Sequence, residues 1–210
     1  MTADLYTPEK IKNDFEVPDV FMPLILAHPR LLPGETKDSF YTLLDIMVGA
    51  VLPVEDTEWL ATIDLAWLQF DIHRYRRWKN LIIMSNRVGA LETALSNTHP
   101  GAALIGATAP IGVESKMQAQ EMNGNPGAHP DLIARLKSHG YDEDTINARA
   151  FEDSMVPLVT VERLLSTARR DVALILREVG LQREFRQRAS AAMKQIEHDE
   201  ERVIEASGLT

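Results

Sequence analysis

No proline interrupts the chain between Pro53 and Pro100, and the stretch from about Asp56 to Ser96 contains one glycine, Gly89. Apolar residues recur in this stretch at steps that add to three, four or eleven positions, which places them on one stripe of an α-helix. A helix of this length extends about 60 Å. The sequence therefore predicts a long helix over 56–96 whose stripe needs a partner surface; its residues are Leu60, Ile63, Trp67, Phe70, Trp78, Leu81, Val88, Leu91 and Leu95.

Helical spacing returns near the C-terminal end, where we expect helices over 130–206. Pro130 suits the first position of a helix, and Gly140 suits the left-handed residue that ends it, with Tyr141 able to fold back on Leu136. Asp142 is a good N-cap for the helix that follows. That helix is predicted to be the second long one, and we expect a kink at its one proline, Pro157.

Five prolines fall within residues 1–34, at Pro8, Pro18, Pro23, Pro29 and Pro33. Because proline lacks a backbone donor and fixes φ, we expect an extended N-terminal arm here. Its apolar stretch from Val20 to Leu32 is expected to lie along the helices or along a second subunit. Thr36 is a plausible N-cap for a helix that ends before Pro53.

Glycines and prolines gather between His99 and Gly127, which predicts a flexible connection over 99–127 with room for a short helix near Glu114 to Glu121. No alternation of apolar and polar residues typical of a strand persists for more than a few positions. We therefore predict an all-α fold with two long helices, forming an elongated hairpin or bundle. The arm over 1–34 would precede one helical domain over 35–210.

Composition narrows the classes of function. The 210 residues include no cysteine, which fits a reducing, cytoplasmic setting, and no apolar run approaches the length that spans a bilayer. The N-terminus also lacks the pattern of a secretion signal. A net charge of −9 argues against general attraction to nucleic acid or to anionic lipid. We expect no membrane association.

The densest candidate site is the run from His73 to Lys79, which combines cations with Tyr75 and Trp78. Phosphate contact and base stacking use this combination. On a helix, however, these side chains radiate in several directions, with Arg74 and Arg77 near the apolar stripe. Pairing of Arg74 or Arg77 with Asp171 or Glu178, and Trp78 in the core, is the favoured interpretation; the alternative is nucleic-acid contact through Arg74, Arg76, Arg77 and Lys79.

No catalytic, cofactor or metal residues are predicted. The paired Glu-x-x-His motifs of helical di-metal sites are absent, and His73 and His198 each stand alone. No serine lies in a Gly-x-Ser-x-Gly motif, and the glycines between Gly101 and Gly112 lack the lysine of a phosphate-binding loop.

Three groups of residues carry a resemblance to a known set of proteins. They are Leu32–Glu35, the runs Asp64–Trp67 and Arg74–Lys79, and the segment from Gly124–Pro126 through His139–Ala148 to Arg169–Asp171 and Leu176–Glu178. Over roughly residues 31–200 the chain resembles a family of bacterial all-helical proteins whose activity is not established. Many of its members begin with a basic arm that suggests contact with nucleic acid, whereas this chain has only Lys10, Lys12 and Arg30 among its first 34 residues against five acidic ones.

We expect a non-enzymatic interaction or scaffold protein that self-associates into a homo-oligomer through coiled-coil-like helical surfaces, with other protein partners also open. The alternatives are a nucleic-acid-associated accessory protein that uses the basic segment, and an enzyme whose site the sequence does not reveal.

Overall fold

The computed structural model describes residues 7–27, 31–99, 109–125, 127 and 129–207. Its secondary structure is helical, and none of the described residues forms a strand. The all-α class is therefore confirmed. The chain divides into two compact units, and the expected arm over 1–34 followed by one helical domain over 35–210 stays a prediction. Unit 1 consists of the chain up to Ile72 together with the segment from Thr167 onward, and unit 2 consists of His73–Ser166.

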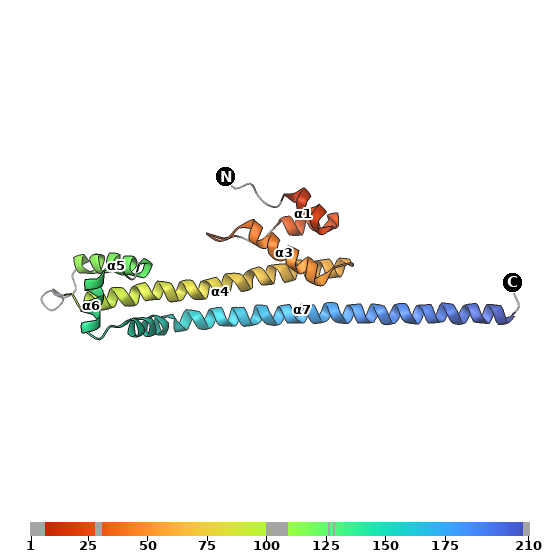
Figure 1. Cartoon of the computed structure of the whole chain (residues 1–210). Helices are drawn as coiled ribbons and strands as arrows, with labels where there is room; N and C mark the ends of the chain where they lie inside the picture. The colour runs from red at the N-terminus through yellow and green to blue at the C-terminus, as the bar shows by residue number, and fades with distance from the viewer. Residues whose placement is uncertain (1–6, 28–30, 100–108, 126, 128, 208–210) are drawn as a thin grey trace. The chain divides into compact units, whose positions relative to one another are not determined.

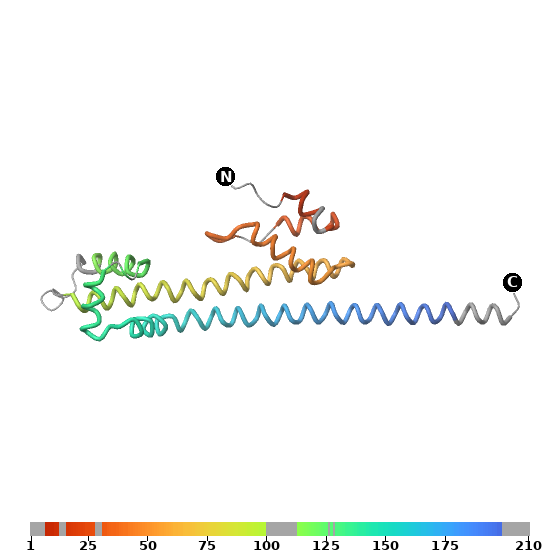
Figure 2. The backbone as a smooth tube through the Cα atoms, viewed as in Figure 1, coloured from red at the N-terminus to blue at the C-terminus, as the bar shows by residue number. Residues whose placement is uncertain are grey.

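Two helices are much longer than the rest, α4 (Asp56–Asn97, 42 residues) and α7 (Glu143–Ser207, 65 residues) (Figure 1). The limits of α4 agree with the prediction for 56–96 to within one residue. Each of these helices contributes one part to unit 1 and another to unit 2. Figure 2 traces the backbone of both helices by residue number. Pro157 lies inside α7 and removes one backbone donor there.

The predicted extended arm contains three short helical elements within residues 8–26. It forms α1 (Pro8–Phe15), the short 3₁₀ turn η1 (Asp19–Phe21) and α2 (Met22–Leu26). The prolines are compatible with this because Pro8 and Pro23 occupy the first turn of a helix, where the missing donor costs nothing. Helix α3 (Lys37–Val51) follows, and its N-cap is Thr36, whose hydroxyl accepts a bond from the Ser39 backbone at 3.2 Å as expected.

Unit 1 has a core of aromatic and aliphatic side chains. Phe40 of α3 is fully buried, and its ring packs edge-on against Trp67 and Phe70 of α4 at centroid distances of 5.7 and 6.0 Å. Ile11 and Phe21 from the N-terminal helices join the same cluster. The apolar arm is thus buried in part against its own chain. On another face of α4, Leu65 packs with Val179, and Val172 and Ile175 of α7 pack against this smaller cluster.

Unit 2 brings parts of α4 and α7 together with α5 (Ala109–Gly124) and α6 (Pro130–Ser138). Helix α5 falls within the predicted connection 99–127 and includes the short helix expected near Glu114; residues 100–108 of that connection lie outside the described part. The predicted turn is confirmed: Gly140 has φ +81°, and the Tyr141 N–H donates to the Leu136 carbonyl at 2.9 Å.

Within unit 2, the contacts between α4 and α7 show that these two helices run antiparallel. Lys79 pairs with Glu162, and Asn86 donates to Ser154 at 2.8 Å, so later residues of α4 meet earlier residues of α7. The predicted stripe of α4 is only partly buried. Ile63, Phe70, Leu91 and Leu95 are buried, whereas Leu60 and Leu81 are exposed because a helix in contact with several neighbours does not bury one straight line of positions.

Candidate functional site

The basic segment of α4 is split between engaged and exposed side chains. Lys79 forms an ion pair with Glu162 of α7. Arg76 and Arg77 are exposed, whereas Arg74 is half-buried, and neither Arg74 nor Arg77 is free of partners. Arg77, which we expected near the apolar stripe, is exposed, and the pairing of Arg74 or Arg77 with Asp171 or Glu178 stays a prediction.

The aromatic residues of the same segment pack on each other. Tyr75 and Trp78 have ring centroids 5.6 Å apart at an interplanar angle of 56°, and Trp78 is half-buried where we had expected a core position. Among the described residues, Arg76 has no hydrogen bond or ion pair to another side chain. The segment therefore does not form a continuous cationic face.

A buried ion cluster lies elsewhere, at the start of α4. Glu58 is 1% exposed and accepts bonds from Nε of Arg183 at 2.9 Å, from the Val54 backbone N–H at 2.9 Å and from Arg186. Arg183 also donates to the Val51 carbonyl at 2.6 Å. The Arg183 hydrogen bond holds the pKa of Glu58 down at about 2, against the opposing effect of burial.

Sequence reasoning missed this cluster and looked for ion pairs further along α4. The available signal was a glutamate in the first turn of a helix that follows Pro53, a position where a carboxylate reaches back to preceding backbone N–H groups. This local signal could not identify the ion-pair partner of Glu58, because Arg183 is 125 residues away in the sequence. We assign the cluster a structural role, joining the α3–α4 turn to α7.

The C-terminal part of α7 exposes a line of apolar side chains. We call this line the α7 stripe and define it as Leu174, Leu181, Phe185, Ala189 and Ile196. At 100° per residue these positions fall within about 80° of one another. Leu181 is 55% exposed, Phe185 73% and Ile196 58%. Glu178 also falls on this line and interrupts it.

Beyond Arg186, α7 has no covering element among the described residues. Every described side chain from Gln187 to His198 is exposed, although this part of the chain is helical. Beside the α7 stripe, unit 1 also has a surface hollow of about 400 Å³, lined by Glu55, Thr57, Leu181, Gln182, Phe185 and Arg186. The end of α7 therefore combines an uncovered helix with a recess at its base.

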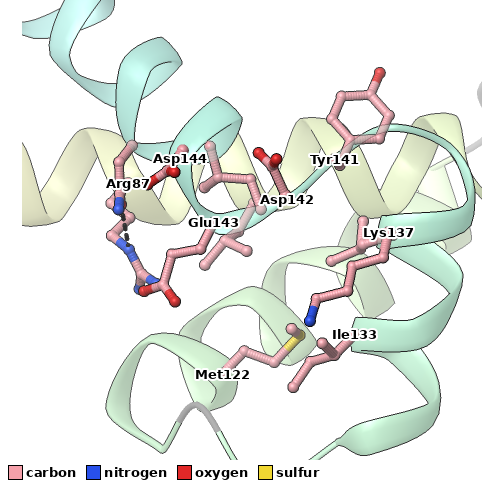
Figure 3. A pocket seen from close by; sticks show the side chains of 12 residues that line it. Arg87, Met122, Ile133, Lys137, Tyr141, Asp142, Glu143 and Asp144 are labelled. Atoms are coloured by element: carbon pink, nitrogen blue, oxygen red, sulfur yellow. Dashed lines mark hydrogen bonds and ion pairs between the residues drawn. The ribbon is translucent and has the colours of Figure 1, made fainter.

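A polar network and a cavity occupy the other unit. Arg87 of α4 donates to Asn123 of α5 at 2.7 Å and to Asn147 of α7 at 3.0 Å, and it pairs with Glu143 at 3.3 Å. These bonds connect three helices beside a cavity of about 510 Å³, whose lining side chains are drawn in Figure 3. The sequence did not suggest this site, because its lining comes from four separate segments.

Two negative findings apply to the part of the chain that the structure describes. No group of three or more histidine and acidic side chains there is arranged to hold a metal ion. None of its helices combines the length and the apolar character that a membrane span requires.

Comparison with known proteins adds no relative: no family model, no curated protein and no solved structure matches this chain.

Proposed function

We propose that this chain is a self-associating helical interaction protein whose main contact surface is the C-terminal part of α7. The observation that carries the proposal is the exposure of every described side chain from Gln187 to His198, including Met193 at 65% and Ile196 at 58%. In the proposed hairpin of α4 and α7, this part of α7 would continue past the end of α4 and would have no partner helix.

A helix with such an apolar face is unfavourable when it stands alone in water. Isolated helices of this length are marginally stable, because most helical stability in proteins comes from packing of an apolar face. Complete burial of one leucine, isoleucine or phenylalanine contributes about 1.5 to 3 kcal/mol. A partner that covers Leu181, Phe185 and Ile196 therefore stabilises both the helix and the complex.

We propose a second copy of the chain as the first occupant, paired antiparallel about a twofold axis. Residues 183–194 carry four cations and one acid, whereas residues 197–205 carry five acids and one arginine. Antiparallel pairing puts the basic stretch opposite the acidic one, while parallel pairing sets like charges together. A twofold axis also lets one patch cover itself. A different helical protein with the same pattern is the second candidate.

The test is the mass of the full chain in solution by sedimentation equilibrium, with 23.5 kDa as the monomer value. We expect a dimer at micromolar concentration and at least a tenfold weaker dimer for Phe185→Glu and for Ile196→Glu. Gln187→Glu is the matched control, because Gln187 is exposed on the same helix, lies off the α7 stripe and receives the same charge. A full chain that stays monomeric at tens of micromolar contradicts the proposal.

The orientation has its own measurement. The chain contains no cysteine, so Leu176→Cys, at an exposed position off the α7 stripe, accepts a single spin label. Antiparallel pairing centred near residue 195, which puts the basic stretch opposite the acidic one, places the two labels about 57 Å apart at 1.5 Å per residue. Parallel pairing places the two labels side by side, and that result would contradict the antiparallel orientation inferred from the charges.

Nucleic-acid association through the basic segment is the second candidate function, favoured by the exposure of Arg76 and Arg77. It ranks lower because Lys79 is engaged by Glu162. Titration with duplex DNA and with RNA at low and high salt decides it, since binding through phosphates weakens steeply as salt rises.

A further inference from the structure

The cavity of unit 2 has an apolar floor built from all four helices of that unit. Leu91 of α4, Met122 of α5, Leu136 of α6 and Ile146 of α7 line it, and each is at most 6% exposed. Its volume of about 510 Å³ falls within the range of small-molecule sites, which are concave, mostly apolar and carry a few polar groups. The floor therefore suits the apolar body of a ligand.

Most of the charged groups on the rim are already engaged. Asp142 caps α7 by accepting from the Thr145 N–H at 2.8 Å and from its hydroxyl at 2.6 Å. Those two bonds lower the pKa of Asp142, with a smaller part from the Lys137 charge. Glu143 is paired with Arg87, whose other two nitrogens donate to Asn123 and Asn147.

Lys137 is the exception among the rim cations. Within the described part of the chain it forms no hydrogen bond or ion pair through its side chain. Figure 3 shows its side chain extending over the cavity, with the amino group beside Met122 and Ile133. The Lys137 ammonium forms no ion pair with a described residue, although its charge contributes to lowering the pKa of Asp142. A cation in this position over an apolar floor is suited to an anionic ligand group.

We propose that this cavity binds a small apolar monocarboxylate, whose hydrocarbon part lies on the floor of Leu91, Met122, Leu136 and Ile146 and whose carboxylate pairs with Lys137. The acidic side chains of the rim set the charge limit: Asp142, Glu143 and Asp144 disfavour a ligand with several negative charges, such as a nucleotide. This site is independent of the α7 stripe.

Octanoate below its micelle concentration is the probe, with octanol and octylammonium as ligands of equal chain length and different head-group charge. Binding is followed by NMR of the full chain labelled on methionine and isoleucine methyl groups. We expect octanoate to shift the signals of Met122, Ile133 and Ile146 and to bind at least fivefold more tightly than octanol. Octylammonium should bind more weakly than either of them.

The variants locate the head group. Lys137→Gln should weaken octanoate at least fivefold and leave octanol unchanged, whereas Lys116→Gln, at an exposed lysine of α5 that does not line the cavity, should change neither. Octylammonium binding as tightly as octanoate overturns the proposal, and so does an unchanged octanoate affinity in Lys137→Gln. Shifts confined to Ile196 would place the ligand on the α7 stripe and would also overturn the proposal.

Discussion

Unit 1 is built around aromatic rings, whereas unit 2 is built around small and aliphatic side chains. Phe40, Trp67 and Phe70 form edge-to-face contacts in unit 1. The core of unit 2 contains four buried alanines, Ala90, Ala94, Ala119 and Ala150, together with leucine, isoleucine and methionine. Alanine lets helix backbones approach closely, but it fills little of the space where several helix ends converge. The unit with alanines keeps a cavity large enough for a ligand.

The largest effect should come from emptying the aromatic cluster. Phe40→Ala is expected to destabilise the fold by about 3 to 5 kcal/mol, because Phe40 is fully buried and its loss leaves a void between α3 and α4. Leu91→Ala in unit 2 should cost about 2 to 3 kcal/mol, since the space it leaves joins an existing cavity. Urea unfolding of both variants measures the difference, and equal costs would show that the two cores are packed alike.

The next largest effect concerns the buried ion cluster of unit 1. Glu58→Gln should cost about 1.5 to 3 kcal/mol, the usual contribution of hydrogen bonds to a charged group. The matched change in unit 2, Arg87→Gln, should cost less, because Glu143 opposite it is 72% exposed. Chemical unfolding at neutral pH tests both, and a larger cost at Arg87 would reverse the ranking.

Glu58 also predicts a pH dependence with a definite sign. Its pKa lies near 2 in the folded protein and near 4.5 as an ordinary glutamate, so the unfolded chain takes up the proton first. The stabilisation from this group is therefore complete above about pH 4.5 and is lost as the pH falls toward 2. Unfolding midpoints measured across that window should fall less steeply in Glu58→Gln than in the unchanged chain. Parallel slopes would contradict the assignment.

The smallest effects should differ in sign between glycines. Gly89 in α4 and Gly180 in α7 have nothing within 4 Å of an added Cβ, so alanine at either should stabilise by about 0.5 to 1 kcal/mol. Gly140→Ala should instead destabilise by about 1 kcal/mol, because Gly140 has φ +81°. Thermal melts compare the three, and a stabilising Gly140→Ala would mean that the turn before α7 is not held in the left-handed conformation.

Local signals predicted the helices well, because caps and breaks are properties of neighbouring residues. Thr36, Pro130, Gly140 and Asp142 all have the predicted role in starting or ending a helix. The proline-rich N-terminal segment was misjudged because proline is compatible with a first helical turn as well as with extended chain. Pairings across long sequence separations, such as Glu58 with Arg183, have no local signal at all.

The candidate sites were less predictable than the helices. Periodicity shows that an apolar position recurs, but it does not show which of several faces a neighbour covers, so the exposure of Leu60, Leu81 and Phe185 could not be read in advance. The cavity of unit 2 depends on how α5 and α6 pack on the two long helices. That packing involves residues from Arg87 to Asn147, none of which stands out by type.

The way the aromatic cluster is drawn from the sequence bears on how the protein is made. All its buried members, from Ile11 to Phe70, lie in the first third of the chain, so the cluster can assemble while the remainder is still being synthesised. Glu58, in contrast, must wait for Arg183 to leave the ribosome before its charge is matched. A nascent chain halted shortly after α4 has emerged should therefore already contain a folded nucleus. In that chain Glu58 should still be hydrated, because Arg183 has not yet been synthesised.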